Sequence, residues 1–141
     1  MALHPAVLMF IGHRYAERRI LEAVHAAGFG LTVSQARLAA RIAPGGSRAT
    51  ELAEQAQLTK QSAAALIDAL ERSGFVERVP DPSDARARLV RLADRGRRAQ
   101  RVARREERAI LAEWEAHLGR PRLTQLQESL EILRELVDPY R

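Results

Sequence analysis

Apolar residues recur at helical spacing through the first part of the chain. Val7, Ile11 and Tyr15 lie four residues apart, so their side chains share one face of a helix. The pattern predicts a helix from about Leu3 to Ala27. Gly28 follows it and is typical of a helix end.

The pattern between Thr32 and Gly74 predicts three short helices. The first is capped by Thr32 or Ser34 and ends before Pro44, the second opens at Ser47 and breaks near Gln57, and the third runs from Thr59 to about Ser73. The shared core of the last two is expected to contain Leu52, Ala53, Leu58, Ala63, Leu66 and Leu70. Two such helices joined by a short break are typical of a helix-turn-helix.

Alternating, β-branched segments then predict an antiparallel hairpin. Its strands are Phe75–Val79 and Arg88–Leu92, and its long loop contains the turn residues of Pro80–Asp84. Asp94 is expected to cap a long helix that ends near Leu118. The expected fold is therefore mainly α with a small β-hairpin.

The last predicted helix carries an apolar seam with alternating spacings of three and four residues. The seam contains Leu123, Leu126, Leu130, Leu133 and Val137. The long terminal helices have more apolar surface than the short middle segment can cover. A second copy of the chain, related by a two-fold axis, would cover it, so we expect a homodimer.

Composition narrows the class of protein. The chain has 141 residues, a net charge of +5 and no cysteine. Its length fits a single domain, and its basic balance favours a polyanionic partner, nucleic acid before membrane surface. Without cysteine there is no disulfide or thiolate site, and with no apolar stretch of membrane-spanning length we expect a cytoplasmic protein with no membrane partner.

The start of the helix that opens at Thr59 carries the first candidate DNA contacts. They are Thr59, Lys60, Gln61, Ser62 and Ala65. Free backbone N–H groups at a helix N-terminus suit a phosphate, and Lys60 adds a charge. Gln61 can hydrogen-bond the edge of an adenine, and the small Ala65 lets the helix lie deep in the major groove. The alternative is that Thr59 is only a cap and Lys60 only a solvated charge.

The hairpin loop carries the second set, which consists of Asp84, Arg86 and Arg88. An arginine at a hairpin tip can enter a narrow minor groove. We expect Asp84 to hold an arginine in a fixed rotamer by a charge-assisted hydrogen bond. The alternative is a hairpin whose charges only face water.

Arginines continue beyond the hairpin. Residues 86–108 contain ten arginines and three acidic residues. Arg95, Arg97 and Arg98 could reach phosphate. We expect Arg101, Arg104, Arg105 and Arg108 to be solvated or to pair with Glu17, Glu22 or the acidic residues of the last helix.

Residues 31–96 resemble the MarR family of winged helix-turn-helix transcriptional regulators. The resemblance rests on Glu51-Leu52-Ala53, Leu58-Thr59-Lys60-Gln61-Ser62, Leu70-Glu71 with Gly74, Val76-Glu77-Arg78, Asp81-Pro82-Ser83-Asp84-Ala85-Arg86-Ala87-Arg88-Leu89-Val90, and Leu92 with Asp94-Arg95-Gly96. The long flanking helices match the family in position. Two departures are Ala85, where relatives commonly have a basic residue, and Ala93, where threonine is common.

The resemblance implies one MarR-like domain over residues 1–141, with dimerisation helices in 1–30 and 97–141. It implies an obligate homodimer on a pseudo-palindromic operator, with the helix that opens at Thr59 in the major groove and Arg86 in the minor groove. It also implies a repressor that is released by a small, often aromatic, effector. A candidate effector pocket would contain His13, Tyr15 and Trp114, although packing is the default role of Trp114.

The sequence contains no motif for metal binding or catalysis. No two of the four histidines have metal-ligand spacing, and no phosphate-binding glycine loop or catalytic triad motif is present, so we expect no enzyme activity, metal or cofactor. A winged helix that binds another protein through the same surface is the rival interpretation.

Overall fold

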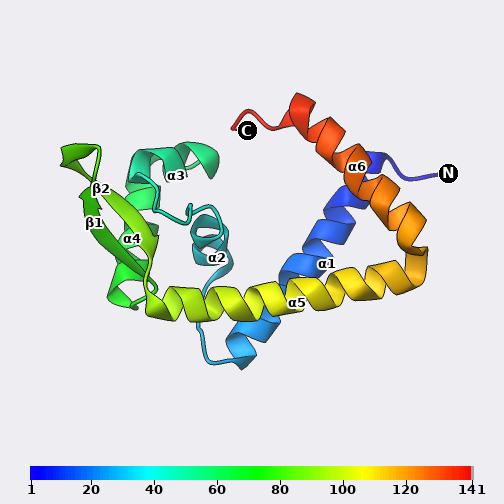
Figure 1. The fold of residues 1–141 in the computed structure, drawn as a ribbon, viewed down its shortest axis with the longest axis horizontal. Helices are drawn as coiled ribbons and strands as arrows, with labels where there is room; N and C mark the ends of the chain where they lie inside the picture. The colour runs from blue at the N-terminus through cyan, green and yellow to red at the C-terminus, as the bar shows by residue number, and fades with distance from the viewer. Residues whose placement is uncertain (141) are drawn as a thin grey trace. The chain divides into compact units, whose positions relative to one another are not determined.

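The computed structural model describes residues 1–140 as six helices and one hairpin (Figure 1). In chain order these are α1 (Pro5–Ala26), α2 (Val33–Ala39), α3 (Ala49–Gln55), α4 (Lys60–Arg72), β1 (Val76–Asp81), β2 (Asp84–Leu92), α5 (Asp94–Leu118) and α6 (Arg120–Val137). The mainly helical fold with one antiparallel hairpin is the predicted class. The chain divides into two compact units, Met1–Ala103 and the remainder from Arg104 on.

Helices α2, α3 and α4 pack with the hairpin around a small aliphatic core in the first unit (Figure 1). Its fully buried side chains are Leu38, Leu52, Ile67, Leu70 and Val90. Ala53 and Ala63 are also buried, and their small side chains allow α3 and α4 to cross closely. The prediction that Leu58 belongs to this core is wrong, because it lies in the turn after α3 with 36% of its surface exposed.

The turn between α3 and α4 has the geometry of a tight helix break. Gln57 adopts a φ of 54°, which reverses the chain, and the backbone N–H of Leu58 donates to the carbonyl of Ala53. At the other end of α4, Gly74 has a φ of 77° and the N–H of Phe75 donates to the Leu70 carbonyl. This is a glycine-terminated helix end, as predicted.

The hairpin is longer and its turn tighter than the sequence suggested. Only Pro82 and Ser83 lie between the two strands, because Pro80 and Asp81 continue β1 and Asp84 opens β2. Pro80 pairs with Arg88 but Asp81 pairs with Asp84, so residues 85–87 bulge from the ladder. The sequence predicts a loop at Pro80–Asp84, but a bulge near the turn accommodates Pro80, Asp81 and Asp84 inside the strands.

The prediction that Ser47 caps α3 is wrong. Arg48 is the N-cap residue, and Ser47 is buried beside β2, where it exchanges two backbone hydrogen bonds with Val90. The Ser47 hydroxyl accepts from the N–H of Ala43 instead. Ser47 therefore fixes the chain before α3 to the hairpin.

The terminal helices carry exposed apolar side chains. On α1 these are Val7, Leu8, Met9, Phe10, Ile11 and Tyr15, and on α6 they are Leu126, Leu130, Ile132, Leu136 and Val137.

Asp94 is the first residue of α5, whereas the prediction had it as the cap residue before the helix. Over residues 1–140, no helix combines the length and the apolar character needed to cross a membrane.

Candidate nucleic-acid interface

The first turn of α4 is exposed and capped. The Thr59 hydroxyl oxygen accepts from the backbone N–H of Ser62 at 3.0 Å and donates to the Ser62 hydroxyl at 2.9 Å. Thr59, Lys60, Gln61 and Ser62 are all exposed, as is Ala65 one turn later. The helix thus presents its positive end, one lysine, one amide and the small methyl group of Ala65 to solvent.

An ion-pair cluster fixes α4 against the hairpin. The Arg78 guanidinium on β1 binds Asp68 at 2.7 Å and Glu71 at 2.6 Å, both on α4. The hydrogen bond to Asp68 and the charge of Glu71 raise the pKa of Arg78, against the opposing effect of its burial. Gln61 and Ala65 lie nearer the start of the helix and take no part in these ion pairs.

The hairpin presents two arginines beside its turn. Arg86 and Arg88 are exposed, and neither guanidinium has an ion-pair partner among residues 1–140. Arg86 lies in the bulge at residues 85–87, where the ladder no longer dictates the direction of its side chain. Both arginines are therefore available to an anion.

The prediction that Asp84 holds an arginine by a charge-assisted hydrogen bond is wrong. Its carboxylate accepts only the backbone N–H of Arg86, at 3.0 Å, and lies 3.8 Å from the guanidinium of Arg48. The residue that forms charge-assisted hydrogen bonds to an arginine is Asp81. Asp84 shapes the bulge locally, because its bond to the backbone is a turn contact.

A buried carboxylate ties the hairpin turn to the start of α3. The Oδ1 atom of Asp81 accepts from the backbone N–H and the hydroxyl of Ser83 at 2.8 and 2.7 Å, and its Oδ2 atom accepts two bonds from Arg48 at 3.1 and 2.8 Å. The hydrogen bonds from Ser83, followed by that from Arg48, lower the pKa of Asp81 to about 2. No spacing pattern predicts this pair, because Arg48 and Asp81 are 33 positions apart in the chain.

The arginines at the start of α5 differ from the prediction. The Arg95 guanidinium lies 4.5 Å from the centre of the Phe75 ring and donates to the Ser73 carbonyl, and Arg97 binds the Leu92 carbonyl and Asp94. These contacts anchor α5 to the winged module and occupy both side chains. Of the three arginines expected to reach phosphate, Arg98 alone has no such contact within the described residues.

The arginines farther along α5 do not pair with the acids proposed for them. Glu17 binds Arg37 at 2.7 Å and Glu22 lies beside Arg18, while Glu131 of α6 and the C-cap residue Asp138 lie beside Arg134. Arg101, Arg104, Arg105 and Arg108 are exposed and have no ion-pair partner in the described part of the chain. The solvated alternative therefore describes these four.

The proposed effector residues are not brought together in one unit. His13 lies 3.4 Å from Glu17, and the Tyr15 hydroxyl accepts from Arg19 at 3.2 Å. Trp114 belongs to the second unit. A groove of about 190 Å³ on α1 is lined by other residues, which are Arg14, Glu17, Arg18, Leu21, Glu22, His25 and Val33. An effector site at His13, Tyr15 and Trp114 stays a prediction.

Comparison with known proteins identifies the family of the winged segment. Residues 29–87 match the family model described as MarR family. No curated protein matches the chain in a sequence search.

Solved structures with the same fold cover nearly the whole chain. MarR from Escherichia coli, in its apo form, is 19% identical with a TM-score of 0.72, and covers 94% of this chain and 98% of its own. RV1404 from Mycobacterium tuberculosis is 18% identical with a TM-score of 0.74, over 98% and 97% of the two chains. MepR from S. aureus, bound to ethidium bromide, is 17% identical with a TM-score of 0.66, over 95% and 97%. Residues 29–87 therefore match the MarR family model, and the chain as a whole has the mainly helical fold with a two-stranded hairpin that these solved structures share.

Proposed function

We propose that this protein is a sequence-specific, double-stranded DNA-binding transcriptional regulator that acts in the cytoplasm as a homodimer. The observation that carries the proposal is the exposed, capped start of α4 in the same compact unit as the two unpaired arginines of the hairpin. A helix N-terminus in the major groove and a hairpin arginine in the minor groove together fit the surface of a duplex.

Each contact has a distinct chemical role in the proposal. The Lys60 ammonium and the free N–H groups at the start of α4 bind phosphate, which sets position but not sequence. Gln61 and Ala65 face the base edges, where an amide reads adenine and a methyl group contacts thymine. Ser62 supplies a hydroxyl beside them, and Arg86 and Arg88 contact the flanking groove. The Arg48–Asp81–Asp84 cluster holds the hairpin turn in place for this contact.

The exposed apolar faces of α1 and α6 support a homodimer. Phe10 is 58% exposed and Leu136 is 83% exposed, which is costly for side chains of this size unless another surface covers them. A second copy supplies an identical surface and also a second α4, so that the pair reads a pseudo-palindromic site.

The proposal also includes that the protein is a repressor and that a small aromatic effector releases it from DNA. One structural relative is the multiple antibiotic resistance repressor MarR, and the structure of MepR contains ethidium bromide. Ligand binding would be read out as a change in operator affinity on addition of candidate aromatic compounds. His13, Tyr15 and Trp114 remain the proposed contacts.

The proposal is tested by selecting fragments of the source genome on the purified protein and sequencing them. We expect a few enriched fragments that share a two-fold symmetric motif. Arg86→Ala should weaken binding to an enriched fragment while the protein stays dimeric in sedimentation. Arg41→Ala is the matched control, because Arg41 is exposed and has no ion-pair partner within residues 1–140. Enrichment of no sequence over random fragments would contradict the proposal.

A protein-binding winged helix is the second candidate, supported by the same exposed charges. It predicts heparin retention that duplex DNA does not compete away, whereas a DNA-binding regulator should be displaced by duplex. The two outcomes separate the classes in one column experiment.

A further inference from the structure

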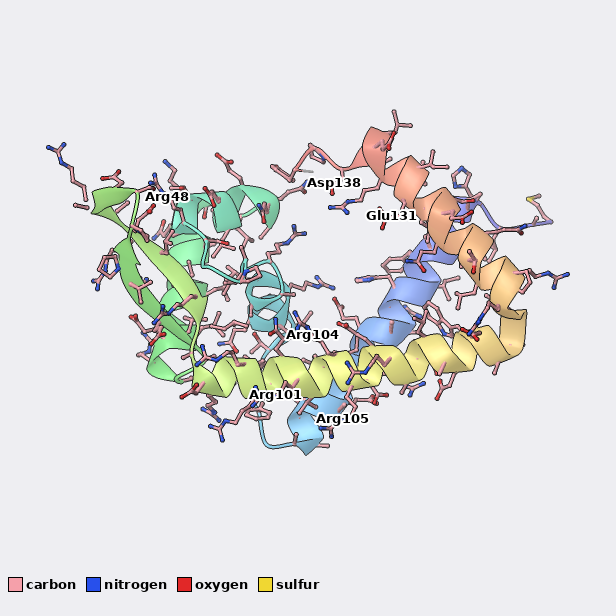
Figure 2. The ribbon with its side chains drawn as sticks, viewed as in Figure 1. Arg48, Arg101, Arg104, Arg105, Glu131 and Asp138 are labelled. Atoms are coloured by element: carbon pink, nitrogen blue, oxygen red, sulfur yellow. The ribbon has the colours of Figure 1, made fainter. Side chains whose placement is uncertain are left out.

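The most concentrated charge in this protein lies on α5 and not on the proposed DNA-reading elements. Six arginines occur within twelve residues of that helix, at positions 97, 98, 101, 104, 105 and 108. Their spacings of three and four residues place them along one side of the helix, over about 16 Å at 1.5 Å per residue. Figure 2 shows Arg101, Arg104 and Arg105 projecting from α5.

The opposite side of the helix faces the core. Ala99 is buried and Val102 and Ala103 are packed against the core cluster, so the orientation of α5 exposes the arginines. All six are exposed, and only Arg97 has an ion-pair partner within the described residues. We call residues 97, 98, 101, 104, 105 and 108 the arginine face.

The part of the arginine face that belongs to the first unit, Arg97, Arg98 and Arg101, lies on α5 beyond the C-terminal end of α4. The first residues of α5 contact the C-terminal end of α4, because Arg95 donates to the Ser73 carbonyl and the N–H of Ala93 donates to Phe75. The start of α4, which carries Gln61, is at the other end of this 13-residue helix, about 20 Å away. The hairpin turn is also remote, since the nine residues of β2 separate it from α5 (Figure 1).

We propose that the arginine face of α5 is a second, sequence-independent binding surface for duplex DNA. Six arginines over about 16 Å amount to one positive charge per ~2.7 Å, which is about 60% of the linear charge density of a duplex with one phosphate per ~1.7 Å of axis. Guanidinium groups bind phosphate in a bidentate manner, and no base-reading side chain is needed for such a contact. A dimer held on its operator by α4 and the hairpin would thus contact a second DNA segment through α5.

The absence of apolar anchors distinguishes DNA from other anionic partners. Among the described residues, no large hydrophobic side chain is exposed between Leu58 and Leu111, so the face lacks the aromatic or aliphatic anchors that dominate protein–protein interfaces. The apolar side of this part of α5 is packed in the core, so it cannot insert into a lipid interface. A partner recognised by charge alone is best matched by a polyphosphate.

The test compares two double charge reversals in the full-length protein. Arg101→Glu with Arg105→Glu removes the centre of the arginine face, and Arg41→Glu with Arg122→Glu makes the same change in charge at two other exposed, unpaired arginines. Binding to a random-sequence duplex is measured by fluorescence anisotropy over a range of salt concentrations. Glutamate keeps the helix propensity of α5, and Arg101→Gln with Arg105→Gln serves if the reversal does not fold by circular dichroism.

We expect the reversal on the arginine face to lower affinity for the random duplex at least about tenfold at low salt and to make the log–log salt dependence shallower by about 2, because two phosphate contacts are lost. The control pair should lose less than about threefold. Equal losses in both pairs, or none on the arginine face, would overturn the inference. Binding of polyglutamate or anionic vesicles that depends on Arg101 and Arg105, with no such dependence for duplex, would also overturn it.

A two-duplex capture separates this inference from the proposed function. Protein held on an immobilised enriched fragment should capture a second, labelled random duplex, and the Arg101/Arg105 variant should keep the first duplex but lose the second. If the fragment is retained and the variant still captures the second duplex, only the arginine-face inference fails. If no fragment is enriched but random duplex binding depends on Arg101 and Arg105, the proposed operator function fails alone.

Discussion

The Arg48 guanidinium lies 2.8 Å from the Asp81 carboxylate, and this contact joins the N-cap of α3 to the end of β1. Ser47, one residue earlier, pairs with Val90 of β2 through two backbone hydrogen bonds. The chain just before α3 is thus fixed to both strands of the hairpin. The relationship sets where the hairpin turn lies relative to the helix-turn-helix, on which the proposed minor-groove contact depends.

Replacing Arg48 with alanine should loosen the hairpin turn without unfolding the module. Asp81 keeps its two bonds from Ser83, so the carboxylate is not left without partners. We expect operator affinity to fall about two- to fivefold, the range of a partly exposed ion pair, and amide exchange at residues 85–87 to accelerate. Arg41→Ala is the control, and unchanged exchange at the bulge in the Arg48 variant would show that the tie does not order the turn.

Asp81 should make the stability of the protein depend on pH in acid. Its pKa lies at about 2 in the folded state against an ordinary value of 3.8, so its stabilising contribution is complete above the ordinary value and is lost as the pH falls toward 2. The urea midpoint of the wild type should therefore fall more steeply over this window than that of Asp81→Asn. Glu54→Gln, at an exposed position, should keep the wild-type slope. Parallel curves for the wild type and Asp81→Asn would exclude this role.

Gly96 is required by a close backbone approach. A Cβ atom at this position would lie 2.1 Å from the carbonyl oxygen of Phe75, which itself accepts the N–H of Ala93. Gly96→Ala should destabilise the fold by roughly 1–3 kcal/mol or more, because α5 must move off the hairpin. Gly30→Ala meets no atom within 4 Å and should change stability by less than about 0.5 kcal/mol. Thermal unfolding of the two variants compares them directly.

Local signals explain how much of the fold was predictable. The cap at Thr59 and the glycine at 74 act within a few residues, and both lie where the sequence predicted. For α2 the sequence left Thr32 and Ser34 as alternatives, and Thr32 is the cap. Ser47 misled the prediction because a serine before a helix favours a cap, whereas its long-range pairing with Val90 decides its position. Leu58 misled it because apolar character does not reveal that a reversed turn at Gln57 leaves the side chain at the surface.

The sequence predicted those parts of the candidate site whose residues all belong to one helix or strand. Lys60 and Gln61 follow directly from the start of α4, and their exposure follows from the buried positions Ala63 and Ile67 on the other side of the same helix. The partners of Asp81 and Arg78 come from other elements, and no spacing rule specifies them. The arginines of α5 could be counted in the sequence, but only the folded chain shows that Arg97 pairs with Asp94 while the other arginines of α5 have no acidic partner within residues 1–140.

Gln61 and Lys60 should respond differently to alanine, because one is proposed to read bases and the other to bind phosphate. Gln61→Ala should lower affinity for an enriched fragment by about five- to a hundredfold, from a bidentate contact of ~1–3 kcal/mol, and leave random duplex affinity nearly unchanged. Lys60→Ala should lower the affinity for both duplexes by the same factor and reduce the slope of log affinity against log salt concentration by about 1. Titrations of both variants against both duplexes, in the same buffers, give the four ratios that decide the assignment. Equal losses on both duplexes for Gln61→Ala would assign its side chain to the phosphate backbone, and the base reading would then have to come from Ser62, Ala65 or the hairpin.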